Sequence, residues 1–218
     1  AGVKSEFFDR RLRVNLSAFY YDYRDQQLQG ILYTQTGRVG RMINIPKSHI
    51  WGGELEVTWR PTERLTINQS LAYKYGEYDE FYFVNSAATE AARDPVTGQY
   101  NTIIYSDRAG ERLPFPRADY KGSVAYVMDV GNWQVEAETN YNYRSSLFST
   151  SSNSVIGDYW LINANLTARP ANGNYSVGLW VNNLTDSYIE ETRNAFISAA
   201  TASPHPPRTY GVRVSWRY

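Results

Sequence analysis

The stretch WQVEAETNYNYR, residues 133–144, decides the fold class, because its side chains alternate between two kinds. Odd positions carry Trp, Val, Ala, Thr and Tyr, whereas even positions carry Gln, Glu, Asn and Arg. Successive side chains of a β-strand point to opposite faces, while an α-helix repeats every 3.6 residues. The stretch is therefore predicted to be a strand with one apolar and one polar face.

The same period of two continues through most of the chain, and helical spacing is nowhere sustained. We expect one further strand to end near Phe8. The sequence thus predicts an all-β chain of about eight strands plus a partial ninth. Alternation is strict in 51–59 and 210–218, and softer in 12–23, 65–78, 120–128, 159–169 and 175–183.

The links between these strands alternate in length. Short polar links rich in turn-forming residues lie at 8–11, 60–64, 129–132 and 170–174. Long links lie at 30–41, 79–113, 147–157 and 187–208. An antiparallel up-and-down meander with short turns at one end and long loops at the other is typical of an outer-membrane β-barrel.

A soluble β-sandwich also alternates, and the placement of aromatic rings distinguishes the two. Rings bracket the aliphatic centres of the apolar faces, at spacings of eight to ten residues. After a tilt of about 40°, such spacings cover about 20–25 Å along the membrane normal, close to the apolar band of a barrel. We therefore predict a transmembrane barrel whose membrane girdle contains Trp51, Trp59, Trp133, Tyr143, Tyr210, Trp216 and Tyr218.

Composition excludes several classes of function. The 22 Lys and Arg balance 22 Asp and Glu, so no basic excess favours nucleic acid. With no Cys and two His, the sequence predicts no metal site and no cofactor. It contains no HExxH, GxSxG, GxGxxG or P-loop motif, so catalysis would have to depend on His49 or His205. We expect that the protein is not an enzyme.

Eight strands could close into a small barrel, but the chain begins directly in a strand, as if cut from something upstream. We also expect no signal peptide at residues 1–6, which have no basic stretch followed by an apolar one. If each strand and its connection take as many residues as they do here, a 22-stranded plugged transporter needs about 600 residues for its barrel. Residues 1–218 are therefore expected to be the C-terminal portion of such a larger barrel, without its plug domain and N-terminal strands.

Four segments make the chain resemble the TonB-dependent outer-membrane receptors: Gly53-Glu54-Leu55-Glu56, the GERLPFP of 110–116, the VNNLTDSY of 181–188 and the PRTYGV of 207–212. The resemblance implies a bacterial outer-membrane receptor that imports a scarce solute, such as a ferric siderophore, with TonB-derived energy. It also implies four partners: outer-membrane lipid, the receptor's own plug domain and missing strands, TonB through the absent N-terminal part, and a small-molecule ligand. Nucleic acid is not among them.

Ligand-binding candidates lie where rings and guanidinium groups gather in the long links, since such groups suit an anionic or aromatic ligand. They are Tyr82, Tyr100, Tyr105, Arg108 and Arg112, joined at the barrel mouth by Arg144 and Phe148. An ordinary surface loop is the alternative. In the alternation of its strand, Trp180 occupies a position that faces the inside of the barrel, so it is a candidate plug contact. The alternative is that a bulge at Gly178 turns it to the other face.

Two other functions stay open at this point. One is a self-contained small outer-membrane barrel with a structural or adhesive role, and the other is a soluble carbohydrate-binding sandwich.

Overall fold

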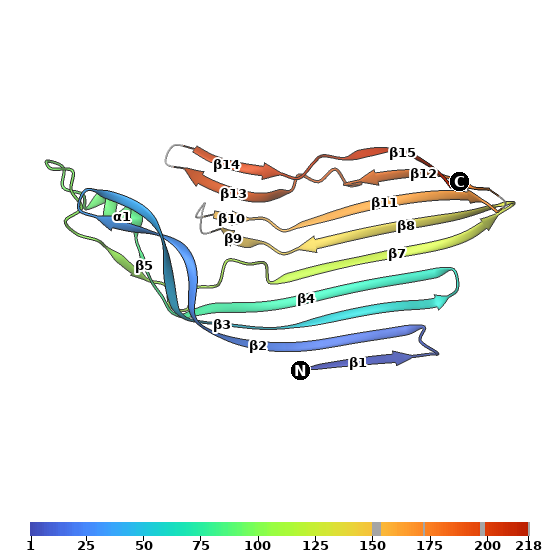
Figure 1. Ribbon diagram of the computed structural model, residues 1–218, viewed down its shortest axis with the longest axis horizontal. Helices are drawn as coiled ribbons and strands as arrows, with labels where there is room; N and C mark the ends of the chain where they lie inside the picture. The colour runs from blue at the N-terminus through green and yellow to red at the C-terminus, as the bar shows by residue number, and fades with distance from the viewer. Residues whose placement is uncertain (150–153, 172, 197–198, 218) are drawn as a thin grey trace. The chain divides into compact units, whose positions relative to one another are not determined.

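The computed structural model describes residues 1–149, 154–171, 173–196 and 199–217. Nine strands form one antiparallel sheet in the order β1-β2-β3-β4-β7-β8-β11-β12-β15 (Figure 1). They are β1 (Gly2–Phe7), β2 (Leu12–Thr34), β3 (Gly37–Thr62), β4 (Leu65–Glu80), β7 (Ala118–Val130), β8 (Trp133–Arg144), β11 (Tyr159–Pro170), β12 (Tyr175–Asn182) and β15 (Thr209–Trp216).

The strand register confirms the two predicted faces. Ala137 of β8 lies between Tyr126 of β7 and Leu166 of β11, whereas its neighbour Glu138 lies between Ala125 and Asn165. Directly opposite residues share a face of a sheet. We call the face of Ala137 the outer face and the face of Glu138 the inner face.

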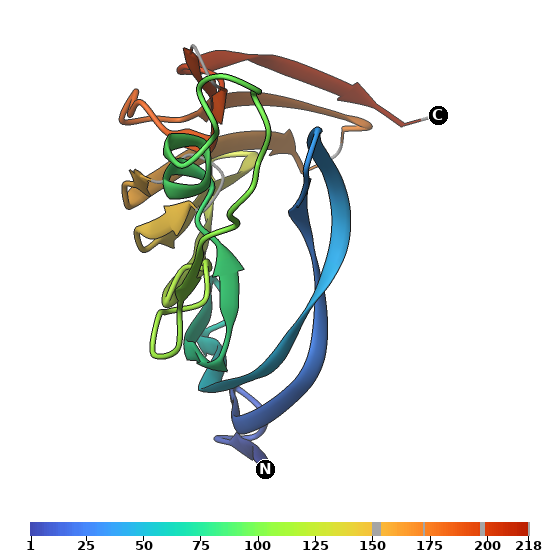
Figure 2. The same ribbon diagram turned by 90° about the vertical axis from the view of Figure 1, so that its left-hand side faces the viewer.

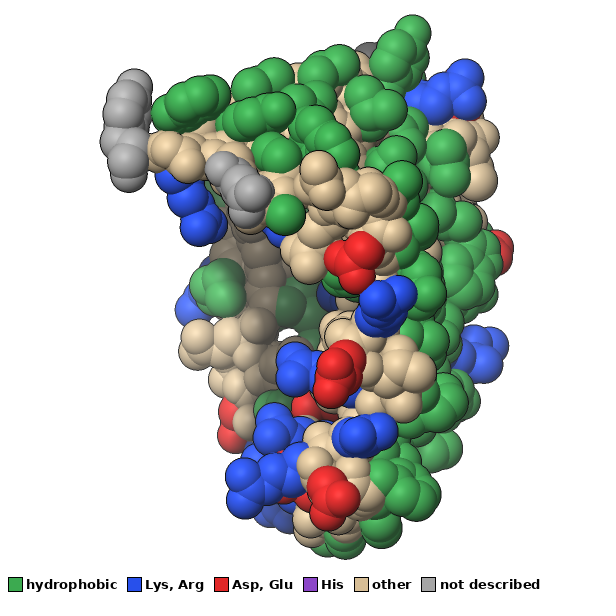
Figure 3. Space-filling view, turned by 90° about the vertical axis from the view of Figure 1, so that its right-hand side faces the viewer, with side chains coloured by type: hydrophobic (Ala, Val, Ile, Leu, Met, Phe, Trp, Pro, Cys, Tyr) green, Lys and Arg blue, Asp and Glu red, His purple; other side chains and the backbone are tan. Residues whose placement is uncertain are grey.

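Apolar side chains of the outer face are largely exposed. Leu179, Val212 and Val214 are 55%, 65% and 68% exposed. Figure 3, which views the end with the short turns, shows hydrophobic side chains gathered over one side of the chain. Large apolar areas of this kind mark contact with another apolar phase, and for a barrel strand that phase is lipid. Among the described residues, no helix has the length and hydrophobicity that would let it span a membrane.

The chain divides into two compact units. The first contains Ala1–Ala18, Gly52–Lys74 and Pro114–Tyr218, and the second contains Phe19–Trp51 and Tyr75–Leu113. Each unit is described by itself below.

The predicted long link at 30–41 is wrong. β2 continues to Thr34 and β3 begins at Gly37, so the two strands reverse within two residues. The physical reason is that this segment contains β-branched and aromatic residues, which favour strands. Two paired strands also satisfy each other's main-chain hydrogen bonds, so they can continue beyond the membrane. Two side chains of this extension, Tyr33 and Ile45, are buried in the second unit.

The other long links contain short elements that the alternation did not predict. Between β4 and β7 lie β5 (Tyr82–Val84), the helix α1 (Ser86–Ala91), drawn in green in Figure 2, and β6 (Tyr105–Asp107). Asn85 caps α1 by accepting a hydrogen bond from the main-chain N–H of Ala88 at 2.9 Å. The remaining links hold β9 (Leu147–Ser149) with β10 (Ser154–Ile156), and β13 (Glu190–Phe196) with β14 (Ala199–Pro204).

The predicted fold class is confirmed. The nine long strands form one sheet and not the two facing sheets of a sandwich, and the other described strands form three two-stranded sheets in the links. The order of the sheet ends at β1 and β15, and no register pairs these two strands among the described residues. The chain is therefore an open part of a barrel wall, as predicted, and not a closed small barrel.

Candidate functional site: the inner face and the loop clusters

A polar groove of about 640 Å³ lies on the inner face of the first unit. Its wall consists of amides, hydroxyls and charges of both signs, which suit a solvated interior surface. These side chains are Glu56, Asn68, Lys121, Ser123, Asn140 and Asn163.

Hydrogen bonds between neighbouring strands order this wall. Asn163 donates from Nδ2 to Oδ1 of Asn140 at 2.9 Å, and Asn68 donates to the hydroxyl of Ser123 at 3.2 Å. Nδ2 of Asn15 lies 3.1 Å from a carboxylate oxygen of Glu56. The inner face therefore presents side chains that are already held in place by one another, so that little ordering remains to be lost on contact with another molecule.

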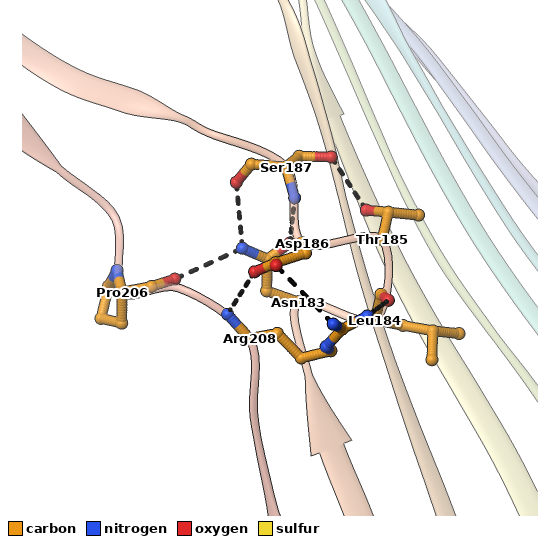
Figure 4. Close-up of polar contacts among 7 residues, drawn as sticks. All are labelled: Asn183, Leu184, Thr185, Asp186, Ser187, Pro206 and Arg208. Atoms are coloured by element: carbon orange, nitrogen blue, oxygen red, sulfur yellow. Dashed lines mark hydrogen bonds and ion pairs between the residues drawn. The ribbon is translucent and has the colours of Figure 1, made fainter.

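A buried asparagine closes the segment after β12 (Figure 4). The side chain of Asn183 is 1% exposed and its φ is +52°, a left-handed conformation that asparagine tolerates. Its Nδ2 donates to the carbonyl oxygens of Ser187 at 3.0 Å and Pro206 at 3.3 Å, and its Oδ1 accepts from the N–H of Ser187 at 3.0 Å. Asp186 accepts from the N–H of Arg208 at 2.9 Å. These contacts tie the two ends of 187–208 together, and we call them the Asn183 clasp.

Arg144 lies in a charged cluster at the loop end of β8, in the first unit. Its guanidinium lies over the ring of Tyr159 at 4.7 Å, and its Nη2 donates to the carbonyl oxygen of Glu190 at 3.2 Å. Its Nε is buried without a hydrogen-bond partner among the described residues. The carboxylate of Glu190 also pairs with Arg193. The cluster thus holds two guanidinium groups and one carboxylate, and Arg144 contacts the main-chain oxygen of Glu190 and not that carboxylate, which leaves a net positive charge available to an anion.

Two further candidates of the first unit have clear positions. Phe148 is 40% exposed and pairs with Val155 across β9 and β10. Trp180 pairs with Gly211 in a register that runs through Gly178 without a shift, so the alternative of a bulge is wrong. A Cβ placed on Gly211 would lie 2.7 Å from Cζ2 of Trp180. The indole therefore lies across this glycine, on the face opposite Leu179.

In the second unit, Tyr100 belongs to a packed network around Glu90, which we call the Glu90 network. The Tyr100 hydroxyl donates to both carboxylate oxygens of Glu90, at 3.0 and 2.9 Å, and its ring meets Tyr33 edge-on at 5.0 Å. Arg38 pairs with the same carboxylate at 3.0 Å, and the guanidinium of Arg93 lies 5.2 Å from the Tyr100 ring. The hydrogen bond to Glu90 raises the pKa of Tyr100. A ligand would have to compete with Glu90 for this hydroxyl.

Tyr82 and Tyr105 are exposed ligand candidates of the second unit, at 67% and 57% exposure. Tyr105 pairs with Val84, two residues from Tyr82 on the same strand, so both rings share one face of the β5–β6 hairpin. Arg108 is engaged with Glu111 at 2.7 Å, while Arg112 is exposed. Two exposed rings on one face can stack against a planar ligand.

Neither histidine forms a catalytic arrangement with a nucleophile among the described contacts. Nδ1 of His49 lies 2.7 Å from Asp79 and its Nε2 lies 3.9 Å from Glu77. Nδ1 of His205 lies 2.8 Å from Glu191, which is half exposed. Within the described residues, no group of three or more His, Cys, Asp or Glu could hold a metal ion.

Aromatic rings form two rows on the outer face of the first unit. At the short-turn end, Tyr175 lies 5.9 Å from Trp133 and stacks on Trp216 at 5.8 Å. At the loop end, Trp160 lies 5.0 Å from Tyr143 and 6.0 Å from Tyr120. Three predicted girdle residues, Trp133, Tyr143 and Trp216, belong to these rows, and Trp51, Trp59 and Tyr210 are exposed; the membrane girdle itself stays a prediction. Tyr218 lies outside the described residues, so its role stays a prediction.

Sequence reasoning missed two polar centres. Glu90 could not be identified from the sequence, because a single acidic residue in a long link forms no repeating pattern. Gln69 did carry one, since it replaces an apolar residue at an odd position of the alternating stretch 65–73. Its contacts are developed below.

Comparison with known proteins completes this description. The family described as "TonB dependent receptor-like, beta-barrel" matches residues 1–184. The ferric yersiniabactin uptake receptor FyuA from Yersinia pestis matches with a TM-score of 0.71 and 19% identity, over 98% of this chain and 28% of that one. The ferric-catecholate import receptor Fiu from E. coli K12 matches at 0.64 and 20%, over 98% and 26%. The copper transporter OprC matches at 0.63 and 19%, over 99% and 31%. The chain thus spans less than a third of each of these structures.

Proposed function

The chain belongs to the TonB-dependent receptor β-barrel family of the Gram-negative outer membrane, and we propose that it forms part of the wall of a receptor that imports a scarce solute. The solute is proposed to be a ferric siderophore, and the energy is proposed to come from TonB. A plug domain and further strands outside this chain are part of the proposal. The family is one of transport receptors and not of enzymes.

One observation carries the proposal: a single nine-stranded sheet has an apolar outer face with an aromatic row at each end and an ordered polar inner face. A wall of this kind separates lipid from a polar lumen. A polar lumen can hold a plug or pass a hydrophilic solute, whereas a purely structural barrel needs neither a groove nor an organised lining.

Tyr82 and Tyr105 are proposed as the first ligand contacts, because their rings are exposed and share one face. Arg112 offers an accessible guanidinium in the same unit, and Arg144 supplies positive charge at the loop end of β8. Many iron chelates combine planar rings with negative charge, so rings and guanidinium groups suit them. Tyr100 and Arg108 are proposed in a supporting role, since their polar groups are engaged within the chain. Phe148 and Trp180 are proposed at the rim and at the plug, respectively.

Uptake of radioactive iron tests the transport proposal. A strain that lacks the receptor is complemented with the full-length gene and supplied with ferric dihydroxybenzoate, with a ferric pyoverdine or with Cu²⁺. We expect uptake of one iron chelate that disappears when the tonB gene is deleted. Uptake of Cu²⁺ alone would overturn the siderophore assignment, and uptake unchanged without TonB would overturn the energy source.

A paired variant tests the ligand contacts. Tyr82→Ala with Tyr105→Ala is expected to weaken binding of the transported chelate about 5- to 150-fold, because each lost stacking contact costs about 0.5–1.5 kcal/mol. The matched control is Tyr188→Ala, a loop tyrosine of the first unit that is 73% exposed. Equal losses in both would contradict the assignment.

A further inference from the structure

A polar cluster on the outer face of the first unit is unexpected for a surface that faces lipid. Gln69 of β4 points to this face together with Leu71 and Ile67, because it pairs with Gly122, which in turn pairs with Tyr141. An unpaired amide in hydrocarbon is costly. Gln69 is satisfied by two hydroxyls: Tyr120 donates to its Oε1, and the hydroxyl of Tyr141 lies 2.6 Å from its Nε2.

The cluster has room because of a glycine and retains spare hydrogen-bonding capacity. A Cβ on Gly122 would lie 2.6 Å from Oε1 of Gln69 and 2.7 Å from Cε2 of Tyr141, so both side chains lie directly over the glycine. An amide nitrogen has two N–H groups, and Tyr141 is its recorded partner among the described residues. One N–H of Gln69, the lone pairs of the Tyr120 oxygen and one lone pair of the Tyr141 oxygen are therefore left for another molecule.

An apolar trough of about 550 Å³ lies next to this cluster on the same face. Its floor consists of the small residues Ala137, Thr139 and Ala164, and its sides include Tyr126, Leu166 and Leu179. The hydroxyl of Thr139 donates to the carbonyl oxygen of Asn163 at 3.0 Å, which leaves its methyl group for the trough. The floor thus presents no free polar group.

Register places the cluster and the trough in one line along β8. Thr139 and Ala137 follow Tyr141 at steps of two residues, each about 7 Å, toward the short-turn end. Along the strand, the trough therefore runs from about 7 to about 14 Å below the cluster, within one leaflet of a hydrocarbon core of about 30 Å. The cluster lies toward the long loops, which face outside the cell in outer-membrane barrels, so the leaflet is the outer one.

From this arrangement we propose that the outer face of β4, β7, β8 and β11 binds one acyl chain of the lipid A of lipopolysaccharide. The chain occupies the trough, and its polar linkage contacts Gln69, Tyr120 and Tyr141. Lipid A chains are attached through amides and carry hydroxyl groups, so they offer both donors and acceptors, whereas the ester linkages of phospholipids offer acceptors only. The cluster is neutral, which suits these linkages better than a phosphate.

Retention of lipid by the full-length receptor tests this proposal. Receptor purified from outer membranes in mild detergent is assayed for hydroxylated fatty acids per barrel and by native mass spectrometry. Ala164→Leu fills the floor of the trough, and we expect it to lower bound lipopolysaccharide at least fivefold. Ala168→Leu is the matched control, since it makes the same change on the same strand and face but outside the trough, and it should change retention less than twofold.

Gln69→Leu provides a second variant that leaves the trough open, and we expect an intermediate loss. Its folding and that of Ala164→Leu are checked by heat-dependent mobility in gels, and delipidated wild-type receptor is titrated with lipid A and, separately, with phosphatidylethanolamine. Three results would overturn the proposal: equal retention in Ala164→Leu and its control, tighter binding of phosphatidylethanolamine, or a mass that shows a second copy of the chain or another protein on this face.

Discussion

Replacing Asn183 with alanine is expected to open the segment that follows β12. The change removes three side-chain hydrogen bonds, two donated to the carbonyls of Ser187 and Pro206 and one accepted from the N–H of Ser187. Each contributes about 1 kcal/mol. Alanine at a φ of +52° costs about 1 kcal/mol more, because the left-handed conformation crowds its Cβ and it lacks the polar side chain with which asparagine offsets that cost locally. The expected loss is about 4 kcal/mol, of which Asn183→Gly should recover the conformational part.

Hydrogen exchange on the full-length receptor in detergent measures this loss. If the clasp opens locally, the Ser187 amide should exchange about a thousandfold faster in Asn183→Ala and about a hundredfold faster in Asn183→Gly. Asn182→Ala changes the exposed neighbouring residue and should have little effect. Equal acceleration in Asn182→Ala, or unchanged exchange at Ser187 in Asn183→Ala, would refute the reasoning.

Three further outcomes are expected. Val135→Arg, on the outer face, should lower barrel stability in urea titrations by about 2–4 kcal/mol, whereas Glu136→Arg on the inner face should cost about 1 kcal/mol, mainly its exposed ion pair. The N–H groups of Thr97 and Val96 lower the pKa of Asp94 below its ordinary value of 3.8, so the turn should keep its exchange protection above that pH and lose it as pH falls further. Gly211→Val should destabilise the last hairpin, since the new side chain overlaps the indole lying across that glycine, whereas Gly157→Ala, with nothing within 4 Å, should be silent in the same thermal-unfolding assay.

Strand identity and face were predictable because the relevant signal is local. In 133–144 each residue reports its own face through the period of two, and the structure gives β8 the same bounds. The placement of short turns at one end of the strands and long links at the other was also predictable from residue types. Of these links, only the one at 30–41 was predicted wrongly. There β2 and β3 continue as a paired hairpin beyond the length that a membrane requires, so the segment predicted as a link is the end of two strands.

The ligand-binding candidates show where this kind of inference stops. Tyr82, Tyr100 and Tyr105 are alike in sequence, since all three are tyrosines in one long link. In the structure, Tyr100 is 8% exposed and bonded to Glu90, whereas the other two rings are more than half exposed. The difference arises from contacts with residues far along the chain, such as Tyr33, which no local pattern encodes.

The sequence by itself determined which residues form most of the strands and which face of each strand is apolar. Only the tertiary structure decided which side chains meet across strands: Gln69 with Tyr120 and Tyr141, Asn183 with Pro206, and Trp180 with Gly211. The physical reason is that the face to which a side chain points depends on the backbone of its own strand. A contact between strands depends on the register of the pair, and the register depends on both segments together.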